Sequence, residues 1–155
     1  MNIILDLDGT LIDQYVLRPH IKKFLLFCFN EFDTVSLWSS TSEQWLYQVI
    51  NNLTTMLYEI SCILKKCCAF HYTFYDKHCT YINNKIIKPL RNINDLSLTN
   101  TLIIDDSIHS FDYNPDNGVY IPTFSSNTIY ADDYLLKIIP KLENILYGAI
   151  SMDLS

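Results

Sequence analysis

Residues 2–11 place a short apolar run directly in front of two aspartates, a glycine and a threonine. Side chains on a strand alternate between its faces, so Asp6 and Asp8 are expected to point the same way where a buried strand ends. Gly9 allows the chain to turn away sharply. Two adjacent carboxylates repel each other and are costly to desolvate, so they need compensation. We expect Mg²⁺ with oxygen ligands and a lysine; the alternative is an ordinary Asp-rich turn.

The composition indicates one domain with a proper core, because 49% of the 155 residues are hydrophobic and only 18% are charged. A formal net charge of -6 argues against direct nucleic-acid binding. There is no secretion-type leader and no apolar run of about 18 residues, so neither secretion nor a membrane span is expected. The five cysteines are interpreted as reduced thiols in a cytoplasmic or nuclear protein.

Short apolar strands alternate with amphipathic helices along the chain. Strands are predicted near 2–5, 34–38, 101–104 and 119–121, and helices near 18–32, 40–64 and from 132 onwards. Pro19 is expected in the first turn of the first helix, Ser40 and Glu43 as a capping box, and Pro140 as a kink or break. This alternation predicts an α/β fold of Rossmann-like type, with a parallel sheet flanked by helices.

The segment 67–87 differs from its surroundings, because aromatic and β-branched residues dominate it. It predicts short strands around 70–75 and 79–87, with Asn83 and Asn84 as a hairpin turn. We therefore expect a single domain, 1–155, that carries a small β insertion within about 41–87 and no large cap.

Polar residues follow three of the predicted strands: Asp6 and Asp8 the first, Ser39 the second, and Asp105 with Asp106 the third. Ligands of open α/β sheets bind beyond the carboxyl ends of the strands, so these groups are expected to form one site.

This set of residues fits phosphoryl transfer through an aspartyl phosphate. Asp6 would be the nucleophile, and Asp8 would protonate the leaving alcohol and later deprotonate water. Mg²⁺ would be held by Asp6, the Asp8 backbone carbonyl, and Asp105 or Asp106. The phosphate oxygens would be bound by Ser39 and Lys88, with a supporting part for Thr10.

At these residues the sequence resembles the haloacid-dehalogenase superfamily, whose first motif is DxDGT. More narrowly, it is similar to phosphatases of the RNA polymerase II carboxy-terminal-domain type, also called the NLI-interacting-factor-like family. The matching pieces are Arg18-Pro19, Leu37-Trp38-Ser39-Ser40, residues 74–79, Ile87-Lys88-Pro89-Leu90 and residues 103–121. The resemblance implies a small Mg²⁺-dependent protein Ser/Thr phosphatase that acts on a phosphorylated peptide segment.

The sequence departs from the family at three places. Gly9 stands where the family usually has Glu or another larger residue, and Asp76 stands where it often has Arg. The stretch 44–66 is also longer than in the family.

Three alternatives remain at this stage. The same chemistry could act on a nucleotide or another small phosphate ester, or the scaffold could be a non-catalytic interaction module. A zinc site could use the Cys and His residues between 62 and 79, although their spacing matches no paired CxxC pattern, and lone cysteines are commonly buried apolar residues. The members of that group are Cys62, Cys67, Cys68, His71, His78 and Cys79.

Overall fold

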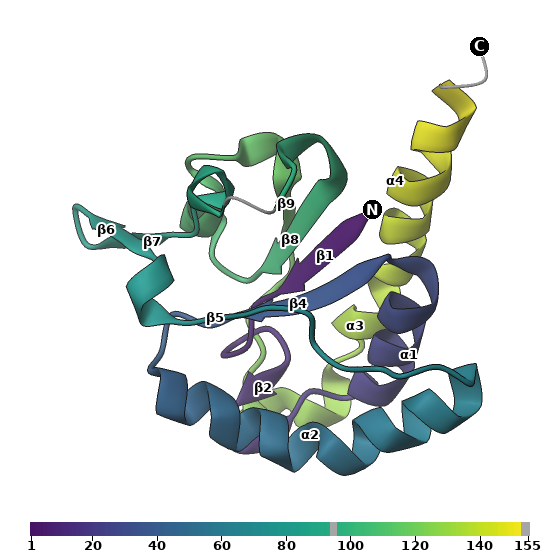
Figure 1. The fold of residues 1–155 in the computed structure, drawn as a ribbon. Coiled ribbons are helices and arrows are strands. Elements are labelled where there is room, and N and C mark those ends of the chain that lie inside the picture. Colours follow the sequence, from purple (N-terminus) through teal and green to yellow (C-terminus); the bar gives the residue numbers. More distant parts are fainter. Residues whose placement is uncertain (94–95, 153–155) are drawn as a thin grey trace.

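The centre of the protein is a five-stranded parallel sheet in the order β5-β4-β1-β8-β9. The computed structural model describes residues 1–93 and 96–152. The strands are β1 (Asn2–Leu5), β4 (Thr34–Trp38), β5 (Thr73–Phe74), β8 (Thr101–Asp105) and β9 (Gly118–Tyr120). The predicted α/β fold with a parallel sheet is confirmed (Figure 1).

Strand β1 lies in the middle of the sheet and pairs with β4 on one side and β8 on the other. Leu5, the last residue of β1, lies opposite Leu37 of β4 and Ile104 of β8. All residues of these three strands except the first of β1 and of β4 are buried, as expected for strands that are covered on both sides. Because the pairing is parallel, their carboxyl ends meet at one edge of the sheet.

The α-helices build the core on one face of the sheet. They are α1 (Ile21–Glu31), α2 (Glu43–Leu64), α3 (Tyr134–Lys137) and α4 (Ile139–Met152). Ile3 and Leu5 of β1 pack in one buried cluster with Phe24 of α1 and Leu46 of α2, whereas Ile4 points into a second cluster. This alternation of neighbouring strand residues separates the two cores.

The second core lies on the opposite face, where Ile4, Trp38 and Ile103 pack against Leu90 and Phe111. Leu90 and Phe111 belong to short 3₁₀ helices, so this face is covered by tight turns rather than by α-helices. The 3₁₀ helices are η1 (Asp76–His78), η2 (Leu90–Asn92), η3 (Leu98–Asn100), η4 (Ile108–Phe111), η5 (Pro115–Asn117) and η6 (Ser126–Ala131).

Two predicted helix starts were wrong by two to three residues. Helix α1 begins at Ile21 after a left-handed His20, so Pro19 precedes the helix instead of lying in its first turn. Helix α2 is capped by Ser42, whose side chain accepts a hydrogen bond from the Trp45 backbone N–H, and not by Ser40. The predicted break near Pro140 is confirmed, because α3 and α4 are separated at Ile138.

The segment 41–87 contains more than a β insertion. It includes α2 and the edge strand β5, which pairs in parallel with β4. Only β6 (Thr80–Ile82) and β7 (Lys85–Ile87) form a separate antiparallel hairpin, which projects from the sheet in Figure 1. Asn83 and Asn84 between them have φ of 50° and 60°, as a tight hairpin turn of this kind requires.

A second small hairpin follows the first motif. Its strands are β2 (Ile12–Asp13) and β3 (Val16–Leu17), which lie where no strand was predicted. The turn between them contains Gln14 with φ of 54° and the exposed Tyr15. This hairpin places Tyr15 beside the first turn of α2, where its ring meets Trp45 edge-on with centroids 4.9 Å apart.

Arg18 ties the first motif to the C-terminal part of the chain. Its side chain is fully buried and donates to the Thr10 carbonyl at 3.1 Å and to the Pro122 carbonyl at 2.8 Å. It also forms a two-point ion pair with Asp132. The hydrogen bond from Arg18 to the Thr10 carbonyl thus holds the loop that follows Asp8 in place.

Within the described residues, no helix is long and apolar enough to cross a bilayer.

Candidate active site

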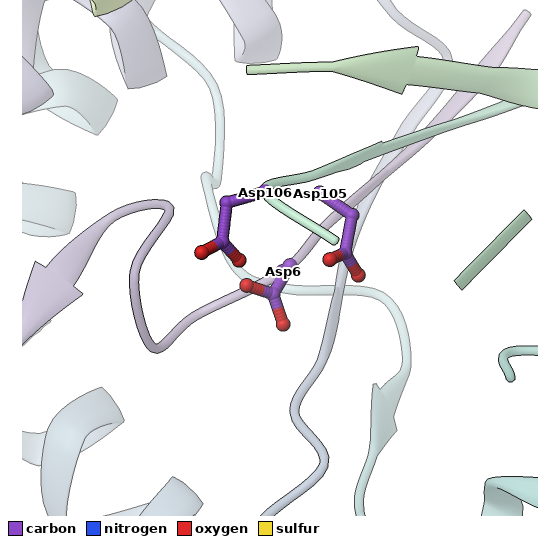
Figure 2. Close-up of side chains that lie close together, drawn as sticks. All are labelled: Asp6, Asp105 and Asp106. Carbon is purple, nitrogen blue, oxygen red and sulfur yellow. The ribbon is translucent and has the colours of Figure 1, made fainter. Parts of the chain in front are cut away.

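Three carboxylates converge at the carboxyl edge of the sheet. Asp6 directly follows β1, Asp105 ends β8, and Asp106 is the next residue. The backbone N–H of Asp6 donates to the Ile104 carbonyl at 2.9 Å, which places the end of β1 against the end of β8. Each of the three carboxylates offers one oxygen, and these oxygens lie within 4.8 Å of one another (Figure 2).

Lys88 is the counter-cation of this cluster. Its ammonium group donates to Asp6 Oδ1 at 2.5 Å, to Asp105 Oδ2 at 2.6 Å and to the Trp38 carbonyl at 2.7 Å. A lysine has three N–H donors, so all of them are used. The Lys88 side chain is only 2% exposed. Burial alone would lower the pKa of Lys88, but the adjoining carboxylates of Asp6 and Asp105 raise it above its usual value.

The Asp6 carboxyl is strongly perturbed. Burial raises its pKa from 3.8 to about 7, against the opposing charge of Lys88, and the Asp105 charge adds to the rise. Burial also raises the pKa of the half-buried Asp106. Each group is harder to ionise than a free aspartate because negative charge is concentrated in a poorly solvated place.

The donor set fits a magnesium ion. Asp6 Oδ2 is buried and has no hydrogen-bond partner among the described residues, so it keeps an oxygen available as a ligand. Mg²⁺ favours a few carboxylate oxygens and completes its octahedron with water and phosphate oxygens. Asp105 and Asp106, at the end of the adjoining strand, each offer a further carboxylate oxygen within 4.8 Å of the one that Asp6 offers.

The hydrogen-bond donors that hold the Asp8 carboxylate differ from the donor that holds Asp6. Its Oδ1 accepts a hydrogen bond from the indole Nε1–H of Trp45 at 3.0 Å, and its Oδ2 accepts one from the Ser39 hydroxyl at 3.1 Å. The carboxylate of Asp8 is not part of the three-carboxylate cluster. The two aspartates of the first motif therefore have different surroundings, as two different chemical roles require.

Gly9 lies where a side chain has no room. Its φ is +84°, and a Cβ built on it would come within 2.5 Å of Asp106 Oδ2. A larger residue at this position would therefore displace the Asp106 carboxylate. At Gly9, where the sequence departs from the family, the first motif thus lies very close to Asp106, the residue after β8.

Of the residues predicted to bind phosphate, Lys88 lines the cavity over the carboxylates, whereas Ser39 and Thr10 do not. Ser39 is fully buried and bonds to Asp8 and, at 2.6 Å, to the Thr41 hydroxyl, whereas its neighbour Ser40 lines the cavity. Thr10 is also fully buried and is not among the residues that line the cavity. The phosphate-binding roles of Ser39, Thr10 and Lys88 stay predictions.

A cavity of about 230 Å³ opens above the carboxylates. It is lined by Asp6, Asp8, Ser40, Lys88, Asp105 and Asp106, and also by residues of the β6–β7 hairpin and of η4. Lys85 and His109 belong to these last two groups and were missed from the sequence. Neither belongs to the residues that carry the predicted chemistry, so only the folded positions of the hairpin and of η4 reveal them.

A second, neighbouring groove of about 410 Å³ is lined by Asp8, Gly9, Tyr15, Thr41 and Trp45, together with Asp13 and Gln14. Asp8 therefore forms part of both hollows. The contact of Trp45 with Asp8 was not predicted from the sequence.

The Cys and His residues between 62 and 79 form no metal cluster among the described residues. The single group of three or more metal-type side chains found there is Asp6, Asp105 and Asp106. Cys62 and Cys67 are exposed, whereas Cys68 is buried.

Comparison with known proteins agrees with this arrangement. The chain is 29% identical over 161 residues to ubiquitin-like domain-containing CTD phosphatase 1 of Xenopus tropicalis, covering 92% of this chain and 49% of that protein. It is 26% identical over 174 residues to zebrafish CTD nuclear envelope phosphatase 1B, covering 95% and 67%. The chain thus spans about half the length of the Xenopus relative.

A solved structure shares the fold. The fission yeast RNA polymerase II CTD phosphatase Fcp1-R271A, bound to beryllium fluoride, matches with a TM-score of 0.53 and 15% identity, covering 94% of this chain and 50% of that one. The model of the NLI interacting factor-like phosphatases matches residues 1–153. With the whole described sheet and its carboxylate edge inside that match, the chain belongs to the NLI interacting factor-like phosphatase family.

Proposed function

We propose that this protein is a Mg²⁺-dependent phosphatase that cleaves phosphate monoesters through an aspartyl phosphate on Asp6, and that its substrates are phosphoserine or phosphothreonine residues of proteins. One observation carries the proposal. Asp6 is buried against Lys88 and two further carboxylates, while Asp8, two residues on, is held separately by Trp45 and Ser39. This is the division between a nucleophile and an acid–base group.

In the first step, a carboxylate oxygen of Asp6 attacks phosphorus, and the bond between phosphorus and the alcohol oxygen breaks. The electron pair of that bond stays on the alcohol oxygen, which takes the proton of the Asp8 carboxyl group. The products are an acyl phosphate on Asp6, a free hydroxyl group on the substrate and an ionised Asp8.

In the second step, water attacks the phosphorus of the acyl phosphate and gives one proton to Asp8. The bond between phosphorus and Asp6 breaks, and its electron pair returns to the Asp6 carboxylate. Inorganic phosphate leaves, and both aspartates are back in their starting states. Lys88 keeps a positive charge beside Asp6 throughout, which offsets negative charge on the transferred group.

Asp6, Asp105 and Asp106 would hold the magnesium ion, as their carboxylates and the unpartnered Asp6 Oδ2 indicate. The bound ion would supply positive charge that brings the anionic nucleophile and the phosphate dianion together. The Asp8 backbone carbonyl is the further ligand that we propose.

A protein substrate is favoured by the shape of the site. The cavity over the carboxylates and the groove beside Trp45 share Asp8, so a segment bound in the groove has its phosphate next to both aspartates. The names of the two phosphatase relatives agree with this choice. We propose the cytoplasm or the nucleus as the place of action.

The test is hydrolysis of p-nitrophenyl phosphate by the wild type, Asp6→Asn and Asp8→Asn, with Mg²⁺ and with EDTA. Turnover by the wild type that requires Mg²⁺ and is lost in Asp6→Asn supports the mechanism. Asp116→Asn is the matched control, because Asp116 is an exposed carboxylate outside the cluster and outside the cavity lining, and we expect this variant to keep its turnover. A folded, Mg²⁺-supplied wild type without turnover would contradict the proposal.

The substrate class is tested separately. Phosphoserine and phosphothreonine peptides should be cleaved with higher kcat/KM than nucleoside monophosphates or sugar phosphates. The reverse order would favour a small-ester phosphatase with the same chemistry.

A further inference from the structure

We infer that Trp45 is a positioning residue for the general acid: its indole N–H fixes Asp8 so that the catalytic proton sits on Oδ2 and is delivered from there. The inference rests on the proposed function and names a residue of the same site.

The first observation is the hydrogen bond itself. Trp45 Nε1 lies 3.0 Å from Asp8 Oδ1, within the normal range for an N–H donor and a carboxylate oxygen. An indole nitrogen can donate a hydrogen bond but cannot accept one. Asp8 Oδ1 is therefore the acceptor whether the carboxyl group is ionised or protonated, and a proton on Asp8 is left to Oδ2.

The second observation concerns Ser39, which is the other partner of Asp8. Its hydroxyl donates to Asp8 Oδ2 at 3.1 Å. A hydroxyl group has a single proton to donate. When Ser39 donates to a phosphate oxygen in the proposed reaction, it no longer donates to Asp8. The indole N–H of Trp45 then remains as the donor that holds the carboxyl group in place.

The third observation is that the indole is itself held firmly. Trp45 is the third residue of α2, and its backbone N–H donates to the side chain of the N-cap residue Ser42 at 3.3 Å. The next residue, Leu46, is fully buried and anchors this turn to the core. The Trp45 side chain itself packs against this core. An indole that is held by its helix and by the core can orient a short carboxylic acid.

The consequence is a dependence on the leaving group. An acid that donates its proton in the transition state matters most when the departing oxygen is a strong base, and least when it leaves readily as an anion. Among substituted phenyl phosphates the shape of the substrate stays almost constant while the basicity of the leaving oxygen changes. The logarithm of kcat/KM against the pKa of the leaving phenol therefore measures how well Asp8 delivers its proton.

The experiment compares p-nitrophenyl phosphate with phenyl phosphate for the wild type and Trp45→Phe, which keeps a ring but removes the N–H. kcat/KM covers the steps up to departure of the phenol, so later hydrolysis of the acyl phosphate does not mask the effect. We expect Trp45→Phe to lose about tenfold more activity on phenyl phosphate than on p-nitrophenyl phosphate, a fraction of what a general acid contributes. Equal losses on both esters would overturn the inference.

Tyr15→Ala is the matched control, because Tyr15 lines the same groove and touches Trp45 but makes no hydrogen bond to Asp8. A lower kcat/KM of Tyr15→Ala on both esters is compatible with the inference, but the ratio of its two kcat/KM values should stay that of the wild type. A change of the ratio in Tyr15→Ala as large as in Trp45→Phe would show that any disturbance of the groove has this effect, and would also overturn the inference.

A second measurement does not depend on turnover. The chain has two tryptophans, so an NMR spectrum of ¹⁵N-labelled indole groups should show two N–H signals. The Trp45 signal is the one that disappears in Trp45→Phe. Asp8→Ala should shift this signal and should leave the other nearly unchanged. An unshifted Trp45 signal would overturn the hydrogen bond. A shifted signal in a protein whose wild type cleaves neither ester would refute the catalytic role together with the proposed function.

Discussion

Arg18 and Asp132 form a two-point ion pair that joins positions 114 residues apart, with Nε 2.8 Å from Oδ1 and Nη2 2.9 Å from Oδ2. Both side chains are almost completely buried. The same guanidinium binds the Thr10 carbonyl and so holds the loop that carries Asp8. Arg18 of the family motif thus has a structural explanation, since its side chain does not line the cavity.

The first prediction is that Arg18→Met strongly destabilises the fold. It leaves the buried Asp132 without its cation, which costs about 3–5 kcal/mol in comparable buried pairs. Urea unfolding measures the free energy directly. Lys137→Met is the control, because Lys137 pairs with Asp133 at the surface, where exposed ion pairs contribute little to stability. Similar losses in both variants would contradict the importance of the buried pair.

The second prediction concerns the pH dependence of stability without metal. The pKa of Asp6 is raised from 3.8 to about 7, so between these values the folded state binds a proton that the unfolded state has released. The contribution of Asp6 to stability is therefore complete below pH 3.8 and falls as the pH rises to about 7. We expect the difference in melting temperature between Asp6→Asn and the wild type, measured in EDTA, to grow in favour of the variant across this window. A constant difference would show that Asp6 does not titrate in it.

The third prediction is that Gly9→Ala weakens the magnesium site more than the fold. A Cβ at Gly9 would approach Asp106 Oδ2 to 2.5 Å, and the Asp106 carboxylate can turn away. The positive φ adds a strain of about 1 kcal/mol for a residue with a side chain. Isothermal titration with Mg²⁺ should show weaker binding, and Gly148→Ala, in an open part of α4, should bind like the wild type. Unchanged Mg²⁺ affinity in Gly9→Ala would refute the displacement.

The fourth prediction is that Lys88→Met makes the fold dependent on Mg²⁺. The variant leaves Asp6 and Asp105 buried without the ammonium group that bridges them at 2.5 and 2.6 Å. Its melting temperature should fall clearly in EDTA and recover in part when Mg²⁺ is added, because either cation compensates the same two charges. Lys22→Met, which removes an exposed pair with Glu59, should respond to neither condition. A Lys88→Met protein as stable as the wild type in EDTA would count against the electrostatic role.

Much of the fold was predictable because its signals are local. The buried strands before Asp6 and Asp105 are apolar runs, and α2 follows the helical period over its whole length. The meeting of Asp6 with Asp105 and Asp106 also followed from the sequence, since parallel strands bring their carboxyl ends to one edge.

The remaining features depend on contacts that no local pattern contains. Trp45 has the spacing of a core residue, and only the position of the β2–β3 hairpin and of Asp8 shows that its N–H is used. Ser42 caps α2, and the sequence did not distinguish it from Ser40 because three neighbouring hydroxyl residues offer nearly the same signal. The edge strand β5 is two residues long, too short for periodicity to place it in the main sheet.

The central place of β1 has a consequence for how the chain is made. Asn2 pairs with Thr34 on one side and with Thr101 on the other, so β1 leaves the ribosome well before a partner that is translated about a hundred residues later. Parallel pairing over such a distance is slow, and half-made chains expose apolar strand edges meanwhile. During synthesis, Asp6, Lys88 and Asp105 can come together only after β8 has emerged, so no nascent fragment that ends before it carries the assembled carboxylate edge.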